Sequence, residues 1–163
     1  MAKVVLVAVL ATSLTGCMPS KEEPVDDSGF TWEEAKRTSQ EVELEVAELI
    51  PPEVIVSVEQ NPTGSLFACN ETQHSWNGAT TVTLAPGTEI EPIVKAMEAH
   101  FLDDDRFEIR TRLNISDKYE VQLMSPETAE NYIFGQGVSN TIRIDSGSAC
   151  FTLPESVYPG GAF

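Results

Sequence analysis

The fold is decided by residues 107–115, which read FEIRTRLNI. Apolar residues and Thr111 fall on the odd-numbered positions, and charged or amide residues fall on the even-numbered ones. Alternation this strict predicts a strand with one face on a core and the other face in water. After Ser116-Asp117-Lys118 the same pattern continues through Tyr119, Val121 and Leu123, as expected for a hairpin partner. This region therefore predicts an antiparallel sheet.

Further strands are predicted on both sides of this hairpin. The first two are expected to pair with each other across the turn residues Asn61-Pro62-Thr63-Gly64, and Asn77-Gly78 marks another turn before the third. Two more strands are expected near the C-terminus, separated by Ser139-Asn140. The predicted ranges are 54–59, 65–70, 80–84, 132–138 and 141–146.

Two helices interrupt the strands. The first is predicted over Phe30–Ile50, with Thr31 and Glu34 in a capping box and Pro51-Pro52 at its end. Thr88 and Glu91 suggest a second capping box and a second helix, which an acidic run at 103–105 stops. The order is helix, three strands, helix, four strands. It predicts the α+β class, with an antiparallel sheet and both helices packed on one face.

The chain of 163 residues has room for one such domain. We place this domain at residues 30–153. Residues 154–163 are rich in Gly and Pro and are expected to form a loose tail. Residues 17–29 contain one aliphatic residue, Val25, among charged residues and prolines, which is typical of a disordered tether.

Residues 1–16 are typical of a signal peptide. Lys3 precedes the apolar run Val4–Leu14, which is too short for a membrane span of ~20 residues. The following Leu14-Thr15-Gly16-Cys17 resembles the lipobox of bacterial lipoproteins. This resemblance implies cleavage before Cys17, a diacylglyceryl group on its sulfur, and a place on the extracytoplasmic face of the cell membrane. The alternative is an ordinary secretory signal that contains an incidental cysteine.

Cys69 and Cys150 are the remaining cysteines. Outside the cytoplasm such a pair usually forms a disulfide, which would join two halves of the sheet. The alternative is a pair of buried free thiols.

The formal net charge of −16, from 26 acidic and 10 basic residues, disfavours nucleic acid as a partner. The membrane, reached through the lipid anchor, is one predicted partner. The acidic charge favours a protein or a cationic molecule of the envelope as a further partner. Solubility alone would also explain an acidic surface.

No catalytic residue, metal site or cofactor is predicted. His74 and His100 fit no zinc-binding spacing, and His74-Ser75 lacks the strand-turn-helix context of a hydrolase nucleophile. The run Asp103-Asp104-Asp105 lacks the spacing of a calcium loop. Gly135-Gln136-Gly137 predicts a bulge or bend, because no helix follows to bind phosphate. Trp76 is expected in the core or at a sheet edge.

The mature sequence is similar to a group of small actinobacterial lipoproteins. The similarity rests on Trp76-Asn77-Gly78, Ala85-Pro86-Gly87-Thr88 and Ser148-Ala149-Cys150-Phe151. Since the group has no assigned activity, the resemblance implies fold and location only. The sequence thus predicts a membrane-anchored, non-catalytic binding module of the cell envelope with an unknown ligand. The alternatives are a small envelope enzyme, or an accessory subunit of an envelope enzyme or transporter.

Overall fold

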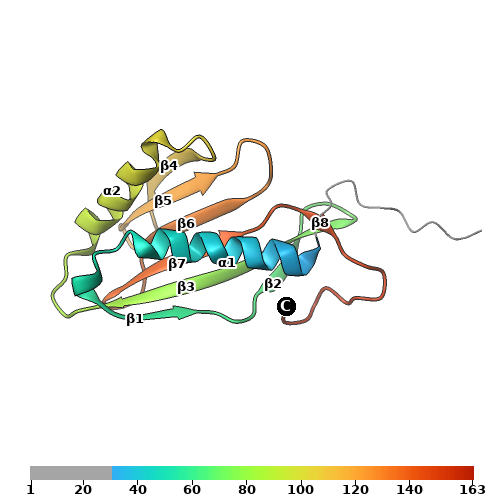
Figure 1. Cartoon of the computed structure of the whole chain (residues 1–163), viewed down its shortest axis with the longest axis horizontal. Coiled ribbons are helices and arrows are strands. Elements are labelled where there is room, and N and C mark those ends of the chain that lie inside the picture. Colours follow the sequence, from blue (N-terminus) through green and yellow to red (C-terminus); the bar gives the residue numbers. More distant parts are fainter. Residues whose placement is uncertain (1–30) are drawn as a thin grey trace, which may run out of the picture.

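A computed structural model describes residues 31–163 of the chain. The predicted signal peptide, Cys17 and the predicted tether lie outside these residues. Within them, two α-helices pack on one face of an eight-stranded antiparallel sheet (Figure 1). The predicted α+β class is confirmed. The strand order is β1-β3-β7-β6-β5-β4, and the short strands β2 and β8 pair with opposite edges of β3.

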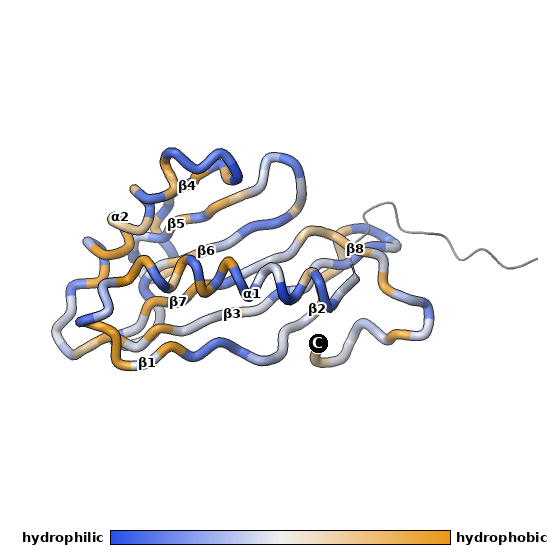
Figure 2. Tube along the Cα trace, viewed as in Figure 1, coloured by the Kyte–Doolittle hydropathy of each residue, from blue (hydrophilic) through white to orange (hydrophobic). Residues whose placement is uncertain are grey.

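Helix α1 (Trp32–Glu48) lies within the predicted range and begins directly after its cap residue, Thr31. The Thr31 hydroxyl accepts the Glu34 N–H, and the Glu34 carboxylate accepts the Thr31 N–H, so the capping box is complete. Apolar residues recur along the helix (Figure 2), and the buried ones pack with sheet residues in the core. A short 3₁₀ turn, η1 (Pro52–Val54), follows and leads into the first strand.

The first three strands are β1 (Ile55–Gln60), β2 (Ser65–Ala68) and β3 (Gln73–Leu84). The predicted hairpin of the first two is wrong, because both pair with β3, one after the other along the same edge. The turn predicted at Asn77-Gly78 is also wrong, since these residues lie within β3. A Cβ atom on Gly78 would lie 2.0 Å from the Trp76 ring. This glycine therefore makes room for an indole rather than for a turn.

Helix α2 (Ile90–His100) starts after Glu89, and the capping box predicted at Thr88 and Glu91 is wrong. The Thr88 hydroxyl instead donates to the Ala85 carbonyl at 2.7 Å, inside the preceding turn. The helix ends in a 3₁₀ turn, η2 (Phe101–Asp103).

Five strands complete the sheet, one more than predicted: β4 (Glu108–Leu113), β5 (Tyr119–Met124), β6 (Asn131–Gln136), β7 (Thr141–Gly147) and β8 (Phe151–Thr152). Only the first apolar residues of the alternating pattern around β4 contact the core. Phe107 is buried and Ile109 packs against the core, whereas Leu113 and Ile115 are exposed. Strand β4 is the last strand of the sheet, and its second half extends past the core.

The main core lies between the helices and the sheet, where α1 covers β3 and β7 and α2 covers β5 and β6. A second cluster joins Ala35, Trp76, Phe151 and Phe163 at the N-terminal end of α1. Phe163 also exchanges backbone hydrogen bonds with Gly64 in both directions. The segment predicted to be a loose tail therefore ends in a packed residue.

Candidate functional site

The face of the sheet opposite α1 and α2, called here the far face, carries rows of polar side chains. Residues paired directly across an antiparallel ladder point to the same face. Because Thr80 and Ser146 contact α1, the neighbouring positions on their strands point to the far face. One row runs Thr81, Arg143, Gly135, Glu120, Arg112, and the next runs Ala79, Asp145, Ile133, Gln122, Arg110.

Ion pairs connect side chains of this face. Arg112 Nε lies 2.7 Å from a Glu120 oxygen, and Arg143 binds Asp145 through both Nε and Nη2. The hydrogen bond that Arg143 donates to Asp145 raises the pKa of Arg143 above its usual value, so this guanidinium stays charged. Since each pair is partly exposed, it contributes little stability and leaves donors available to a ligand.

Two hollows adjoin the far face. The first, of about 510 Å³, is lined by exposed Phe67 and by Asn61, Asn77, Arg143 and Asp145. The second, of about 340 Å³, lies between the β4–β5 turn and the β6–β7 turn. We call the second one the Lys118–Arg143 hollow. Its lining residues are Thr81, Asn114, Ser116, Lys118, Gln136, Gly137, Val138, Thr141 and Arg143.

A third hollow, of about 550 Å³, lies beside the start of α2 and contains Glu89, Glu91, Lys95 and Tyr119 in its lining. Lys95 is bound to Glu91 at 2.7 Å, and the other lysine in this lining, Lys118, also lines the second hollow.

Beneath α1, the side chain of Glu43 is fully buried. Its carboxylate accepts hydrogen bonds from the hydroxyls of Thr80 and Ser146 and from the Gln60 amide. Nearby Tyr132 donates to Glu130, and burial, followed by that carboxylate, raises the Tyr132 pKa well above its usual value. This polar network fixes how α1 sits on the sheet, and the Glu43 carboxylate within it is closed to solvent.

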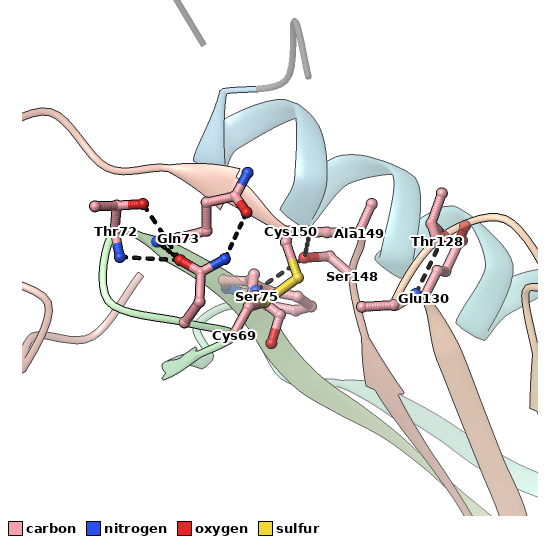
Figure 3. Close-up of a disulfide and its surroundings, with 12 residues drawn as sticks. Cys69, Thr72, Gln73, Ser75, Thr128, Glu130, Ser148, Ala149 and Cys150 are labelled. Atoms are coloured by element: carbon pink, nitrogen blue, oxygen red, sulfur yellow. Dashed lines mark hydrogen bonds between the residues drawn. A yellow bond between two sulfur atoms is a disulfide. The ribbon is translucent and has the colours of Figure 1, made fainter. Parts of the chain in front are cut away.

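The predicted disulfide is present between Cys69 and Cys150 (Figure 3). Cys69 directly follows β2 and Cys150 directly precedes β8, so the bond ties together the two short strands that flank the start of β3. Asn70 organises the neighbouring β2–β3 turn by accepting the N–H groups of Thr72 and Gln73. This end of the sheet is a structural clamp.

The other residues considered from the sequence do not form a catalytic group. His74 and Ser75 are adjacent on β3 and therefore point to opposite faces, and the buried His74 Nδ1 has no hydrogen-bond partner in the described part of the chain. His100 is exposed, with its ring 5.4 Å from that of Phe101, as expected for a surface position. Trp76 is fully buried, which confirms its core assignment.

Asp103, Asp104 and Asp105 belong to no cluster of metal-binding side chains in the described part of the chain. Across residues 31–163, no three His, Cys, Asp or Glu side chains gather as they would around a metal ion. Asp104 is engaged with Arg106, whose guanidinium also binds Glu45 of α1. None of the helices in this part of the chain is long and apolar enough to cross a membrane.

A bulge or bend is predicted at Gly135-Gln136-Gly137, and the bulge is wrong, because β6 pairs in regular register up to its end at Gln136. Gly137 follows the strand and leads into a bend at residues 138–140. A Cβ on Gly135 would lie 2.9 Å from the Tyr119 carbonyl oxygen, so close strand approach explains this glycine.

Sequence reasoning missed Glu43 and the hollows. A signal for Glu43 existed, since it follows the buried Ser39 of the same helix by four residues, about one helical turn. No sequence signal predicts the hollows, because the order of the strands in the sheet decides which residues line them.

Comparisons of the chain with models of protein families, with curated proteins and with solved structures found no match.

Proposed function

We propose that this chain is a lipid-anchored, non-catalytic binding module on the extracytoplasmic face of the cell membrane. The anchor is Cys17, in the lipobox-like sequence that follows an apolar run. The disulfide between Cys69 and Cys150 supports a location outside the cytoplasm, because such bonds persist mainly in oxidising compartments.

The far face of the sheet carries the binding role. Both helices cover the other face, and the far face offers charged and amide side chains beside two hollows of about 340 and 510 Å³. These volumes lie within the range of small-molecule sites, ~300–1,000 Å³. The disulfide clamp and the regular β-ladder hold the side chains in place, and this lowers the entropy cost of binding.

The anchor is tested by replacing Cys17 with Ala in bacterial cells that express the full chain. Two acyl chains give stable membrane residence, whereas one gives marginal binding. The wild type should incorporate labelled fatty acid and sediment with membranes, and Cys17→Ala should lose the label. Cys69→Ala serves as a control that removes a cysteine without affecting the anchor. Persistent labelling of Cys17→Ala would overturn this assignment.

A cationic envelope partner is the second candidate, and the surface of α1 favours it. Glu33, Glu48 and Glu53 on or beside this helix are exposed and form no ion pair within the described residues. Complementary charge raises the encounter rate at low salt. Capture of basic envelope proteins by the full chain should decrease from low to physiological salt and in the variant with Glu48→Gln and Glu53→Gln. Equal capture at every salt concentration by both proteins would contradict this candidate.

A further inference from the structure

The Lys118–Arg143 hollow differs from the rest of this acidic protein in its charge. Lys118 and Arg143 are its charged lining residues, and no Asp or Glu lies among the described residues that line it. The other two hollows both contain carboxylates, including Asp145 in one and Glu89 in the other. In a chain with a formal charge of −16, a hollow whose lining holds two cations, neutral groups and no carboxylate is suited to an anion.

Several hydrogen-bond donors of this hollow are not used by the protein. Lys118 forms no ion pair with any described residue, and Arg143 binds Asp145 through Nε and Nη2, which leaves Nη1 available. The Asn114 side-chain oxygen accepts the N–H groups of Ser116 and Lys118, at 2.9 and 3.1 Å. The Asn114 amide NH₂ group is therefore turned away from its own turn and has no acceptor within residues 31–163.

The shape of the hollow follows from the neighbouring turns. Gly137 lies in the lining, and a Cβ atom there would be 2.6 Å from the Thr141 hydroxyl oxygen. Thr81 and Ser116 add hydroxyl groups. Because the β4–β5 and β6–β7 turns belong to hairpins of the same sheet, the backbone holds these donors in a fixed arrangement.

We propose that the Lys118–Arg143 hollow binds a phosphate group of an envelope ligand. A guanidinium, an ammonium, an amide and two hydroxyls match the several acceptor oxygens of a phosphate, and bonds between charged groups are about twice as strong as neutral ones. The β4–β5 and β6–β7 turns that line the hollow lie at the end of the sheet where β3 finishes, and the N-terminal end of α1 lies at the other end (Figure 1).

This inference rests on the proposed function, since an envelope ligand is expected only for an envelope protein. Separate experiments can contradict the proposed anchor and the proposed phosphate site. Loss of the Cys17 anchor would be seen in cells, whereas phosphate binding by the purified chain depends only on the hollow.

The test is a titration of the full chain, in a non-ionic detergent, with inorganic phosphate and with short-chain phosphatidylglycerol at constant ionic strength. Binding is followed by the NMR signals of the β4–β5 and β6–β7 turns. Lys118→Gln and Arg143→Gln should each weaken binding at least about tenfold. Arg110→Gln is the matched control, because it removes the same charge from the far face outside the hollow.

Tighter binding of inorganic phosphate would indicate a soluble phosphate ligand, and tighter binding of the lipid would indicate a headgroup. Either result supports the proposal when Lys118→Gln weakens it and Arg110→Gln does not. Unchanged affinity in Lys118→Gln, an equal loss in Arg110→Gln, or acetate binding as tight as phosphate would overturn it.

Discussion

Glu43 shows how one buried side chain fixes a helix on a sheet. Its carboxylate has three donors, from β1, β3 and β7, and it forms no ion pair among the described residues. A buried charge is costly unless its oxygens are hydrogen-bonded, and here they are. The geometry allows a single placement of α1, since a shift of one residue would separate the carboxylate from the hydroxyls of Thr80 and Ser146.

Replacing Glu43 with Ala should therefore lower the free energy of unfolding by about 3 kcal/mol, because it leaves buried donors without an acceptor and creates a cavity. Glu43→Gln should cost less, since hydroxyls can rotate to accept from an amide. Glu41→Ala, an exposed position on the same helix, should change stability by less than about 0.5 kcal/mol. Denaturant unfolding measures all three, and equal stability of Glu43→Ala and Glu41→Ala would contradict this account.

Asp104 gives a prediction about pH. Its carboxylate binds Arg106, whose side chain holds the pKa of Asp104 below its usual value of 3.8. A carboxyl whose pKa is lowered by folding stabilises the native state above the unfolded-state pKa, and this stabilisation is lost as the pH falls through the folded-state value.

Asp104→Asn should thus reduce stability at pH 7 by up to about 1 kcal/mol, and the difference from wild type should shrink below pH 3.8. The matched control is Asp103→Asn, which removes an exposed carboxylate that has no ion pair in the described structure. Unfolding curves at pH 7 and pH 3 provide the measurement. A difference that grows on acidification would show that the sign is wrong.

At the scale of elements, some local signals were readable from the sequence, whereas pairing between distant segments was not. The capping box of α1 depends on residues three apart and formed as predicted, but the same spacing at Thr88 and Glu91 formed none. The partner of β2 depends on where β3 begins, and Asn77-Gly78 has the composition of a turn although it lies within a strand. The same limit applies to the candidate site, because its rows of side chains come from strands that are distant in the sequence.

The Trp76–Gly78 contact explains why Asn77-Gly78 has the composition of a turn although it lies within β3. Both residues point toward α1, and the indole lies over Gly78 in place of a side chain. Gly78→Ala would place a Cβ 2.0 Å from the Trp76 ring, and overpacking of this kind costs about 1–3 kcal/mol. Gly161→Ala is the matched control, since the nearest atom to its Cβ would lie at 3.6 Å. Thermal unfolding of both variants tests the contact, and equal midpoints would contradict it.

For the whole molecule, charge is distributed unevenly. The described residues form six ion pairs, and each uses an arginine or lysine beside a carboxylate. Of the row Glu41, Glu45 and Glu48 on α1, the first two bind Arg37 and Arg106. Glu48 forms no ion pair in this part of the chain, so neutralisation along the helix is incomplete. With 26 acidic and 10 basic residues, self-repulsion exceeds what these pairs offset.

Salt should therefore stabilise this protein. Raising ionic strength from 0.01 M to 0.15 M shortens the screening length from ~30 Å to ~8 Å, which weakens repulsion among carboxylates spread over the surface. The same salt weakens the exposed ion pairs, but such pairs contribute about 0–1 kcal/mol each and are few. Repulsion is stronger in the compact state than in the expanded unfolded chain, so its screening favours folding. We expect the free energy of unfolding to increase by about 1 kcal/mol, or the midpoint of thermal unfolding by about 4 °C.

A variant with Glu48→Gln and Glu53→Gln should respond less to salt, since two unpaired charges have been removed. A midpoint that falls with salt would instead show that the ion pairs dominate the electrostatic free energy of this fold.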